Sequence, residues 1–443
     1  MSNSAQGGNV EAPRDGTLDR LRLINEWHAR PNISLPHPLR CSHVAVLRKD
    51  QSEADAWHDI NRFCQQQDQS GPAPGSRYHV VELGSCLLKW ESHTEATSHT
   101  LLVQGNATPP FSETALDFLD QNKRAELQDD MIVGVHIEVL PSPGTDDPTG
   151  YDLARSLLGS RNLFGGVMSD NTANVWSSFR LDAAGFVRLV IIDRGISERR
   201  LARLLQRLLD MEMYRILAMK ALPSARAVMS KLDKLEPKLQ AVMAELASSS
   251  DLGSREHALA RITDLAAEVE QTASANSSLF ASARAYSSIV ERRAEEVREE
   301  IVSGNQRYTN FLMRALAPAM RTCDAAERRL GELAQRVARS ANLLSTMVDI
   351  EQSRQNQRVM SSMADNAKRQ LRLQQAVEGF SIFAISYYAV GLIKYSLDAA
   401  ASAGMPVDSK LLTGLAAPAV FALVFLSIRF VRRRMLDRRD GGD

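Results

Sequence analysis

Two apolar runs near the C-terminal end constrain this chain most, because each is long enough to cross a lipid bilayer. The first, residues 376–397, has Glu378 and Lys394 as its only charges, both close to an end; the second, residues 411–431, is uncharged until Arg429. A helix rises about 1.5 Å per residue and the hydrocarbon core is about 30 Å thick, so roughly 20 residues suffice. Lys394 can extend its amine to the interface. We therefore expect a transmembrane hairpin over 376–431, with the lipid bilayer as a partner.

Flanking cations predict how the hairpin is oriented. Three stand before the first run (Lys368, Arg369, Arg372) and five follow the second (Arg432, Arg433, Arg434, Arg438, Arg439), whereas the intervening residues 398–410 hold one, at their edge. Positive residues are retained in the cytoplasm. Both termini should be cytoplasmic, with residues 432–443 as a basic tail. The alternative, a buried helical hairpin of a soluble protein, is disfavoured by this arginine cluster.

Composition limits the remaining possibilities. A chain of 443 residues is too long for one ordinary core, so several structural units are expected. Lysine plus arginine equals aspartate plus glutamate at 53 each, which argues against nucleic acid as a partner. The four cysteines are scattered, which suits a reducing compartment rather than a disulfide framework or zinc ribbon. Residues 1–20 contain no apolar segment typical of a secretory signal and are expected to be a disordered leader.

Residues 197–375 have the composition of long helices, poor in glycine and proline and rich in Ala, Leu, Glu, Arg and Gln. Polar, glycine-containing breaks at 248–254 and 303–305 divide them into three antiparallel helices after a leucine-rich helix over 197–220. Apolar or small residues recur at alternating three and four spacing, as in coiled coils, with Asn276 as a polar register residue. The seams are Met229, Leu232, Leu235, Leu239, Val242 and Leu246; Ile262, Leu265, Val269, Thr272, Asn276, Leu279, Ala283, Tyr286 and Val290; and Met320, Cys323, Leu330, Ala334, Val337, Ala341, Leu344 and Val348. The last helix is expected to continue into the first membrane segment, so this stalk either transmits motion or is only a spacer or oligomerisation element.

Residues 21–196 are expected to form a cytoplasmic α/β or α+β domain. About seven strands are predicted, over 42–47, 78–83, 86–95, 100–105, 131–140, 174–181 and 186–193, with helices over 52–67, 113–121 and 151–158. The LFGG sequence at 163–166 lacks the spacing and lysine of a nucleotide-binding loop, so Gly165 and Gly166 are interpreted as a turn.

Eight of the nine histidines precede residue 140, which makes a metal or acid–base site worth weighing. In an extended strand, Glu91, His93 and Glu95 would share one face with Lys89, and two carboxylates with an imidazole could hold a divalent metal ion. The alternative is a solvated edge face of an antiparallel sheet. A second candidate is the NEWHARP motif with Trp27, His28, Arg30 and Pro31, where the alternative is a capping or hydrogen-bonded histidine. No nucleophile elbow or kinase loop set is found, so nothing in the sequence supports an enzyme.

Four motifs carry a resemblance: NEWHARP, KWESHTE, the RRLARLLQRLLDMEMYR helix followed by ALP, and EGFSIFAISYYAVGLIKY. The chain resembles an uncharacterised bacterial family described as predicted membrane-anchored proteins, over nearly its whole length after the leader. The resemblance implies a multi-pass protein of the bacterial inner membrane and brings no established activity.

The order of parts is also similar to that of CorA-type magnesium transporters, which have a cytoplasmic α/β domain, a helical stalk and two C-terminal membrane helices. Those proteins are homopentamers whose first membrane helix lines the pore and ends in Gly-Met-Asn. Residues 387–392 occupy the corresponding position in this chain, and only Gly391 matches that motif. The resemblance therefore does not imply magnesium selectivity. The residues that would mark a pore or membrane signature are Ser386, Tyr387, Tyr388, Gly391 and Lys394. As one polar stripe, Ser386, Tyr387 and Lys394 would face a lumen or partner helix, where the lysine would repel cations.

Three functions are consistent with the sequence. The leading hypothesis is a CorA-like homo-oligomeric channel or transporter for an unidentified ion, with a cytoplasmic sensing domain. The alternative is a membrane-anchored scaffold or regulatory protein without transport activity. The third is a metal-dependent, membrane-tethered enzyme that uses the His/Glu-rich strand.

Overall fold

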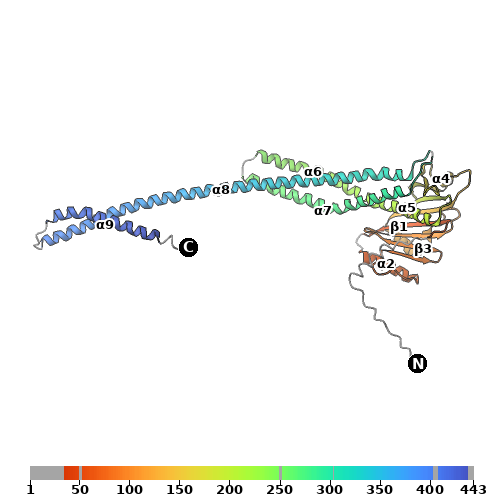
Figure 1. Ribbon diagram of the computed structural model, residues 1–443, viewed down its shortest axis with the longest axis horizontal. Helices are drawn as coiled ribbons and strands as arrows, with labels where there is room; N and C mark the ends of the chain where they lie inside the picture. Colours follow the sequence, from red (N-terminus) through yellow and green to blue (C-terminus); the bar gives the residue numbers. More distant parts are fainter. Residues whose placement is uncertain (1–33, 49–51, 249–251, 303, 403–407, 438–443) are drawn as a thin grey trace, which may run out of the picture. The chain divides into compact units, whose positions relative to one another are not determined.

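The computed structural model describes residues 34–48, 52–248, 252–302, 304–402 and 408–437 (Figure 1). These residues fall into two compact units. The first comprises the described parts of Met1–Ala247 and Ala260–Ala341, and the second those of Ser248–Leu259 and Asn342–Asp443. The motif residues Trp27, His28, Arg30 and Pro31 lie outside the described residues.

An eight-stranded mixed sheet forms the first half of the first unit, in the order β2-β3-β4-β1-β5-β8-β7-β6. Neighbouring strands are antiparallel except β5 and β8, which run parallel. The strands are β1 (Leu39–Leu47), β2 (Tyr78–Leu83), β3 (Cys86–Ser92), β4 (Ala96–Gln104), β5 (Met131–Pro141), β6 (Phe164–Met168), β7 (Ala173–Leu181) and β8 (Val187–Asp193). The expected sheet domain with mixed secondary structure is therefore present.

Both faces of the sheet are covered (Figure 1). Helices α2 (Glu53–Gln66) and α3 (Gln121–Asp129) and the 3-10 turn η1 (Ala115–Phe118) pack on one face around Trp90, Leu101 and Val44. Helix α4 (Tyr151–Leu158) covers Trp176, Val190 and other apolar residues of the β8–β7 side. The opposite face of the sheet meets α5 (Glu198–Met219), so alternate residues of the central strands are buried on opposite sides.

Two of the three helices predicted for this domain are confirmed, and one is wrong. Residues 113–121 form only the turn η1, and the helix begins at Gln121 instead. The Asp120 side chain caps it by accepting a hydrogen bond from the Lys123 backbone N–H at 2.9 Å. Asp120 and Gln121, which were expected at the end of the predicted helix, therefore stand at the beginning of a separate helix.

The turn predicted at LFGG is also wrong, because Gly165 and Gly166 lie in edge strand β6. A Cβ atom on Gly165 would stand 1.9 Å from the Val175 carbonyl oxygen, and one on Gly166 would stand 2.3 Å from that of Glu300. Glycine here permits close backbone approach rather than a turn. The segment after α7 accepts and donates hydrogen bonds at this edge, through Glu300 and Gln306, and thereby covers it.

Helices α6 (Ala221–Ser248), α7 (Leu252–Glu296) and α8 (Tyr308–Ser402) follow, and the parts of them that belong to the first unit lie side by side (Figure 1). Most of the predicted seam residues are buried, among them Leu232, Ile262, Val290, Leu330 and Val337. Leu279 is an exception, because Phe280 takes the buried position beside it. Ion pairs then join the helices, with Arg329 Nη1 2.8 Å from Asp233 and its Nε 2.9 Å from Glu236.

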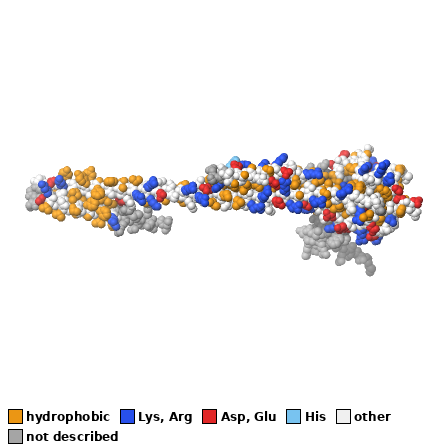
Figure 2. Space-filling model, turned by 90° about the horizontal axis from the view of Figure 1, so that it is seen from above, with side chains coloured by type: hydrophobic (Ala, Val, Ile, Leu, Met, Phe, Trp, Pro, Cys, Tyr) orange, Lys and Arg blue, Asp and Glu red, His pale blue; other side chains and the backbone are white. Residues whose placement is uncertain are grey.

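In the second unit, α8 runs on without a break into the first apolar run, and α9 (Ser409–Asp437) contains the second. The Phe383 and Phe421 rings, on α8 and α9, have centroids 5.5 Å apart. Most large apolar side chains here are exposed, as the orange patch on this hairpin shows in Figure 2. Two helices of the described chain are thus long and apolar enough to cross a membrane, which is the coarse feature the sequence predicted.

Candidate functional site: a buried polar cluster between the sheet and the helices

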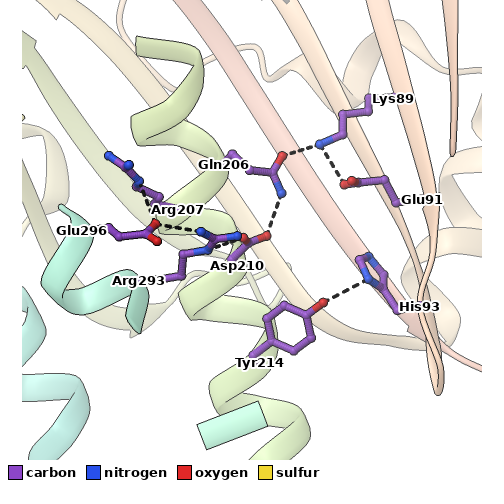
Figure 3. Close-up of polar contacts among 9 residues, drawn as sticks. All are labelled: Lys89, Glu91, His93, Gln206, Arg207, Asp210, Tyr214, Arg293 and Glu296. Atoms are coloured by element: carbon purple, nitrogen blue, oxygen red, sulfur yellow. Dashed lines mark hydrogen bonds and ion pairs between the residues drawn. The ribbon is translucent and has the colours of Figure 1, made fainter. Parts of the chain in front are cut away.

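A chain of charged and polar side chains crosses the boundary between β3 and helices α5 and α7 (Figure 3). We call it the junction cluster, and its members are Lys89, Glu91, His93, Gln206, Arg207, Asp210, Tyr214, Arg293 and Glu296. Lys89, Glu91 and Asp210 are buried and the other members are partly buried. A buried polar group is costly unless it finds a partner. The contacts of each member therefore show whether its charge or polar group is satisfied within the protein.

The cluster begins with an ion pair on β3. Lys89 Nζ stands 2.8 Å from Glu91 Oε2, and their side chains are only 10% and 8% exposed. Lys89 also donates a hydrogen bond to Gln206 on α5. β3 is the second strand of the sheet and is covered by α5, so the alternative of a solvated edge face is wrong.

From Gln206 the contacts continue along α5 and across to α7. Gln206 donates to Asp210 at 2.6 Å, and Arg293 Nε donates to the other oxygen of Asp210 at 2.8 Å. Arg293 Nη1 and Arg207 Nε both contact Glu296 Oε2, at 2.7 and 3.1 Å. Burial raises the pKa of Asp210, and the nearby Arg293 guanidinium opposes that rise. A continuous set of charge-assisted contacts thus connects sheet to bundle.

His93 and Glu95 do not lie in the strand, which ends at Ser92, so the expected alternation of all four residues on one strand face is wrong. They belong to the turn between β3 and β4, where the His93 N–H donates to the Ala96 carbonyl at 2.8 Å. The chain must reverse here because β4 begins at Ala96 and pairs antiparallel with β3.

The turn is fastened to the helices through both of these side chains. His93 Nδ1 lies 3.2 Å from the Tyr214 hydroxyl, and its Nε2 lies 3.1 Å from Ser98 Oγ. Glu95 accepts from Lys220 at 3.0 Å and from the Tyr286 hydroxyl at 3.3 Å. Burial, followed by the Glu95 charge, raises the pKa of Tyr286 to about 12.

Glu91, His93 and Glu95 are therefore each engaged by different neighbours. Among the residues that the structure describes, no three His, Cys, Asp or Glu side chains come together in a group that could hold a metal ion. The divalent-metal hypothesis stays a prediction. The geometry does show that these side chains hold the sheet against the helices.

The opposite face of the sheet has a smaller polar group. Ser42 Oγ and His136 Nδ1 are 2.9 Å apart, and Glu138 accepts a hydrogen bond from the Phe111 N–H at 3.0 Å. Burial lowers the pKa of His136 to about 4 and raises that of Glu138 to about 7. The sequence does not reveal this group, because its members are distant in the chain: Ser42 is 94 residues from His136.

The residues of the expected membrane signature do not form one stripe. Ser386 is buried, and its hydroxyl is without a hydrogen-bond partner among the described residues. Tyr387, Tyr388 and Lys394 are exposed, whereas Gly391 is partly covered. Helical periodicity places residues seven apart on one face, so Tyr387 and Lys394 share a face and Ser386 points elsewhere.

Comparison with known proteins identifies a family for which no function is described. A family model described as "Protein of unknown function (DUF3422)" matches residues 17–435. Comparison with curated proteins found no match.

Proposed function

We propose that this chain, which belongs to the DUF3422 family of proteins of unknown function, is a membrane-anchored scaffold or regulatory protein that holds its sheet domain on the cytoplasmic side of the bacterial inner membrane. The main support for this proposal is the continuity of α8. The beginning of this helix packs against the sheet domain, and its other end has an exposed apolar surface. Its first turn is fixed by rings: Phe311 lies 4.0 Å from Phe164 and 4.5 Å from Phe179, measured between centroids.

The other end of α8 has the surface expected in lipid. Phe380, Tyr387, Tyr388, Leu392 and Tyr395 are each more than 70% exposed. Burying a large apolar side chain gains about 1.5–3 kcal/mol, so this many in water would be strongly unfavourable. The excess of arginine and lysine outside the interhelical segment supports cytoplasmic termini.

Homo-oligomerisation is the second part of the proposal. Before the membrane run, α8 exposes Leu343, Met347, Val359, Met360 and Met363 among other apolar side chains, outside any segment long enough to span. A copy of the same helix is the simplest partner for these exposed apolar side chains. The mass of the detergent-solubilised chain tests this directly: an oligomer is expected, and a monomer would contradict it.

The junction cluster supports a scaffold, because it fixes the sheet to α5 and α7, which belong to the same unit as the beginning of α8. A test of the anchoring role is fractionation of cells that produce the full chain and a chain ending at Arg372. The full chain should remain with membranes after carbonate washing, and the shortened one should be released. Release of both would overturn the proposal.

Ion transport is a second candidate, favoured by one observation: Tyr387 and Lys394 are polar, exposed and on one face of an apolar helix. In an oligomer built on the CorA-like plan, that face could line a path, and the lysine would favour anions. Flux through liposomes that contain the purified chain tests this. Transport abolished by Gly391→Trp would support a pore, whereas no flux from the native chain would exclude it.

Binding of a divalent metal at Glu91, His93 and Glu95, which the third hypothesis requires, would have to break the contacts of His93 with Tyr214 and of Glu95 with Lys220. Metal analysis of the purified chain and of His93→Ala tests it. Stoichiometric metal lost in the variant would support the site, and metal-free native protein would end the hypothesis.

A further inference from the structure

Residues 352–377 of α8, directly before and at the start of its apolar run, are exposed throughout. At about 1.5 Å per residue this stretch is roughly 39 Å long. Most of the stability of a helix in a protein comes from the packing of one of its faces against a neighbour. A partner that covers one face of this stretch would therefore stabilise it.

The charges of this stretch lie on one side of the helix. At about 100° per residue, its charged side chains fall within about 100° of the helix circumference. They are Arg354, Arg358, Asp365, Lys368, Arg369 and Arg372. The opposite side of the helix has apolar and amide side chains and no charge.

Residues on this uncharged side recur at alternating four and three spacing, which is the pattern of a coiled coil. We call them the α8 seam: Asn356, Met360, Met363, Ala367, Gln370, Gln374 and Val377. Met360 is 73% exposed and Met363 is 67% exposed. A seven-residue repeat is slightly shorter than two turns of an α-helix, so two helices that pack along it wind around each other with a left-handed twist.

The same spacing continues into the apolar run, on the side of α8 away from α9. It reaches Ser381, Ala384, Tyr388, Gly391 and Tyr395. Both tyrosines are more than 70% exposed. On the other side of α8, Ser386 is buried and the Phe383 ring lies against that of Phe421. Serine, alanine and glycine allow helices to approach closely within a membrane.

A second copy of this chain fits the α8 seam better than an unrelated helix. In a hairpin that crosses the membrane in one orientation, α8 of every copy is parallel and at the same depth, so identical residues meet. Asn356 and Gln370 then each meet their own counterpart, and an amide both donates and accepts hydrogen bonds. The charged sides of both copies stay in water.

We infer that two copies of this chain associate through the α8 seam, parallel and in register, and that the contact continues in the membrane along Ser381, Ala384 and Tyr388. The inference rests on the proposed anchoring and homo-oligomerisation, and it adds which face of α8 meets the other copy. Helix α9 then lies on the outside of the pair. Tyr387 and Lys394 are about a quarter turn away from this face and do not point to the other copy.

Disulfide cross-linking of the full chain in isolated membranes, with copper phenanthroline as the oxidant, tests this face. The four native cysteines are buried, so the reaction reports single introduced cysteines. Met363→Cys lies in the seam, and Ser361→Cys, its matched control, lies two residues away on the charged side. Both positions are exposed, so the fold should tolerate either change.

A second pair of variants tests the contact within the membrane. Ser381→Cys continues the seam on α8, and Leu423→Cys is exposed on α9. The two positions are at a similar depth, because each is two residues from the contact between Phe383 and Phe421 in antiparallel helices. A disulfide requires Cα atoms within about 7 Å, so each seam variant should give at least about tenfold more covalent dimer than its control.

The possible results separate this inference from the proposed homo-oligomerisation. Equal cross-linking of Met363→Cys and Ser361→Cys, more dimer from Leu423→Cys than from Ser381→Cys, or no dimer from any variant would overturn the inferred face even where the mass in detergent is that of an oligomer. A monomeric mass would overturn the proposed homo-oligomerisation, and the inference with it.

Discussion

Removing one partner of the Lys89–Glu91 pair should destabilise the sheet far more than removing both. In Lys89→Met, the Glu91 carboxylate stays buried without its cation, and the Gln206 oxygen loses a donor. Breaking a buried pair from one side costs about 3–5 kcal/mol. In the double variant Lys89→Met/Glu91→Leu no charge is left unpaired, and the residual cost is about 1–3 kcal/mol for the unsatisfied Gln206 and imperfect packing. A coupling energy of about 2 kcal/mol or more is therefore expected.

Urea denaturation of the full chain in detergent, followed by tryptophan fluorescence, measures these costs. All four tryptophans precede residue 177, and Trp90 and Trp176 are buried in the sheet unit, so the signal reports that unit rather than the hairpin.

The exposed Arg77–Glu53 pair, with side chains 53% and 48% exposed, provides the control. Arg77→Met should cost no more than about 1 kcal/mol. Equal losses for Lys89→Met and Arg77→Met, or strict additivity of the Lys89 and Glu91 changes, would refute the view that the buried pair is a connected part of the junction.

Three further predictions concern stability. Burial lowers the pKa of His43 and His99 to about 3 and of His136 to about 4, so the folded chain cannot take up protons that the unfolded chain binds below pH 6.5. Stability should fall between pH 8 and pH 5 by about 2 kcal/mol for each histidine; a urea midpoint that is flat over this range would contradict it. Gly165→Ala should destabilise by about 2 kcal/mol or more because its Cβ meets the Val175 carbonyl, whereas Gly331→Ala, in open space on a helix, should be neutral or stabilising by up to about 1 kcal/mol. Tyr214→Phe removes the contact with His93 and should cost about 0.5–1.5 kcal/mol; no change in the thermal midpoint would show that the contact contributes nothing.

The sequence predicted the parts of the fold that depend on local periodicity. The helical seams through Leu232, Ile262 and Val337 were visible because apolar spacing repeats within one helix, and the two apolar runs were visible from length alone. The sequence does not predict strand β6, because its two glycines have no side-chain pattern. They are required by carbonyl oxygens that lie close in the fold, that of Val175 for Gly165 and that of Glu300 for Gly166.

The candidate site was predictable only in part. Lys89, Glu91 and His93 drew attention as charged residues within a β-rich segment, but their partners are distant in sequence: Gln206 is 117 residues from Lys89. Gln206 and Asp210 did give a signal, since both interrupt a leucine-rich helix four residues apart. That pattern indicates polar positions on the buried face of α5, but it does not identify the strand that packs against this face.

The claim that the hairpin spans the membrane, with the sheet unit in the cytoplasm, is tested most directly by cysteine labelling in intact cells. The four native cysteines are buried, so the native chain gives a low background. Ser402→Cys lies at the end of α8 and Glu82→Cys is exposed on the sheet unit. A membrane-impermeant maleimide should label Ser402→Cys in intact cells and Glu82→Cys only after permeabilisation. Labelling of Glu82→Cys in intact cells, or protection of Ser402→Cys there with labelling after permeabilisation, would contradict the proposed topology.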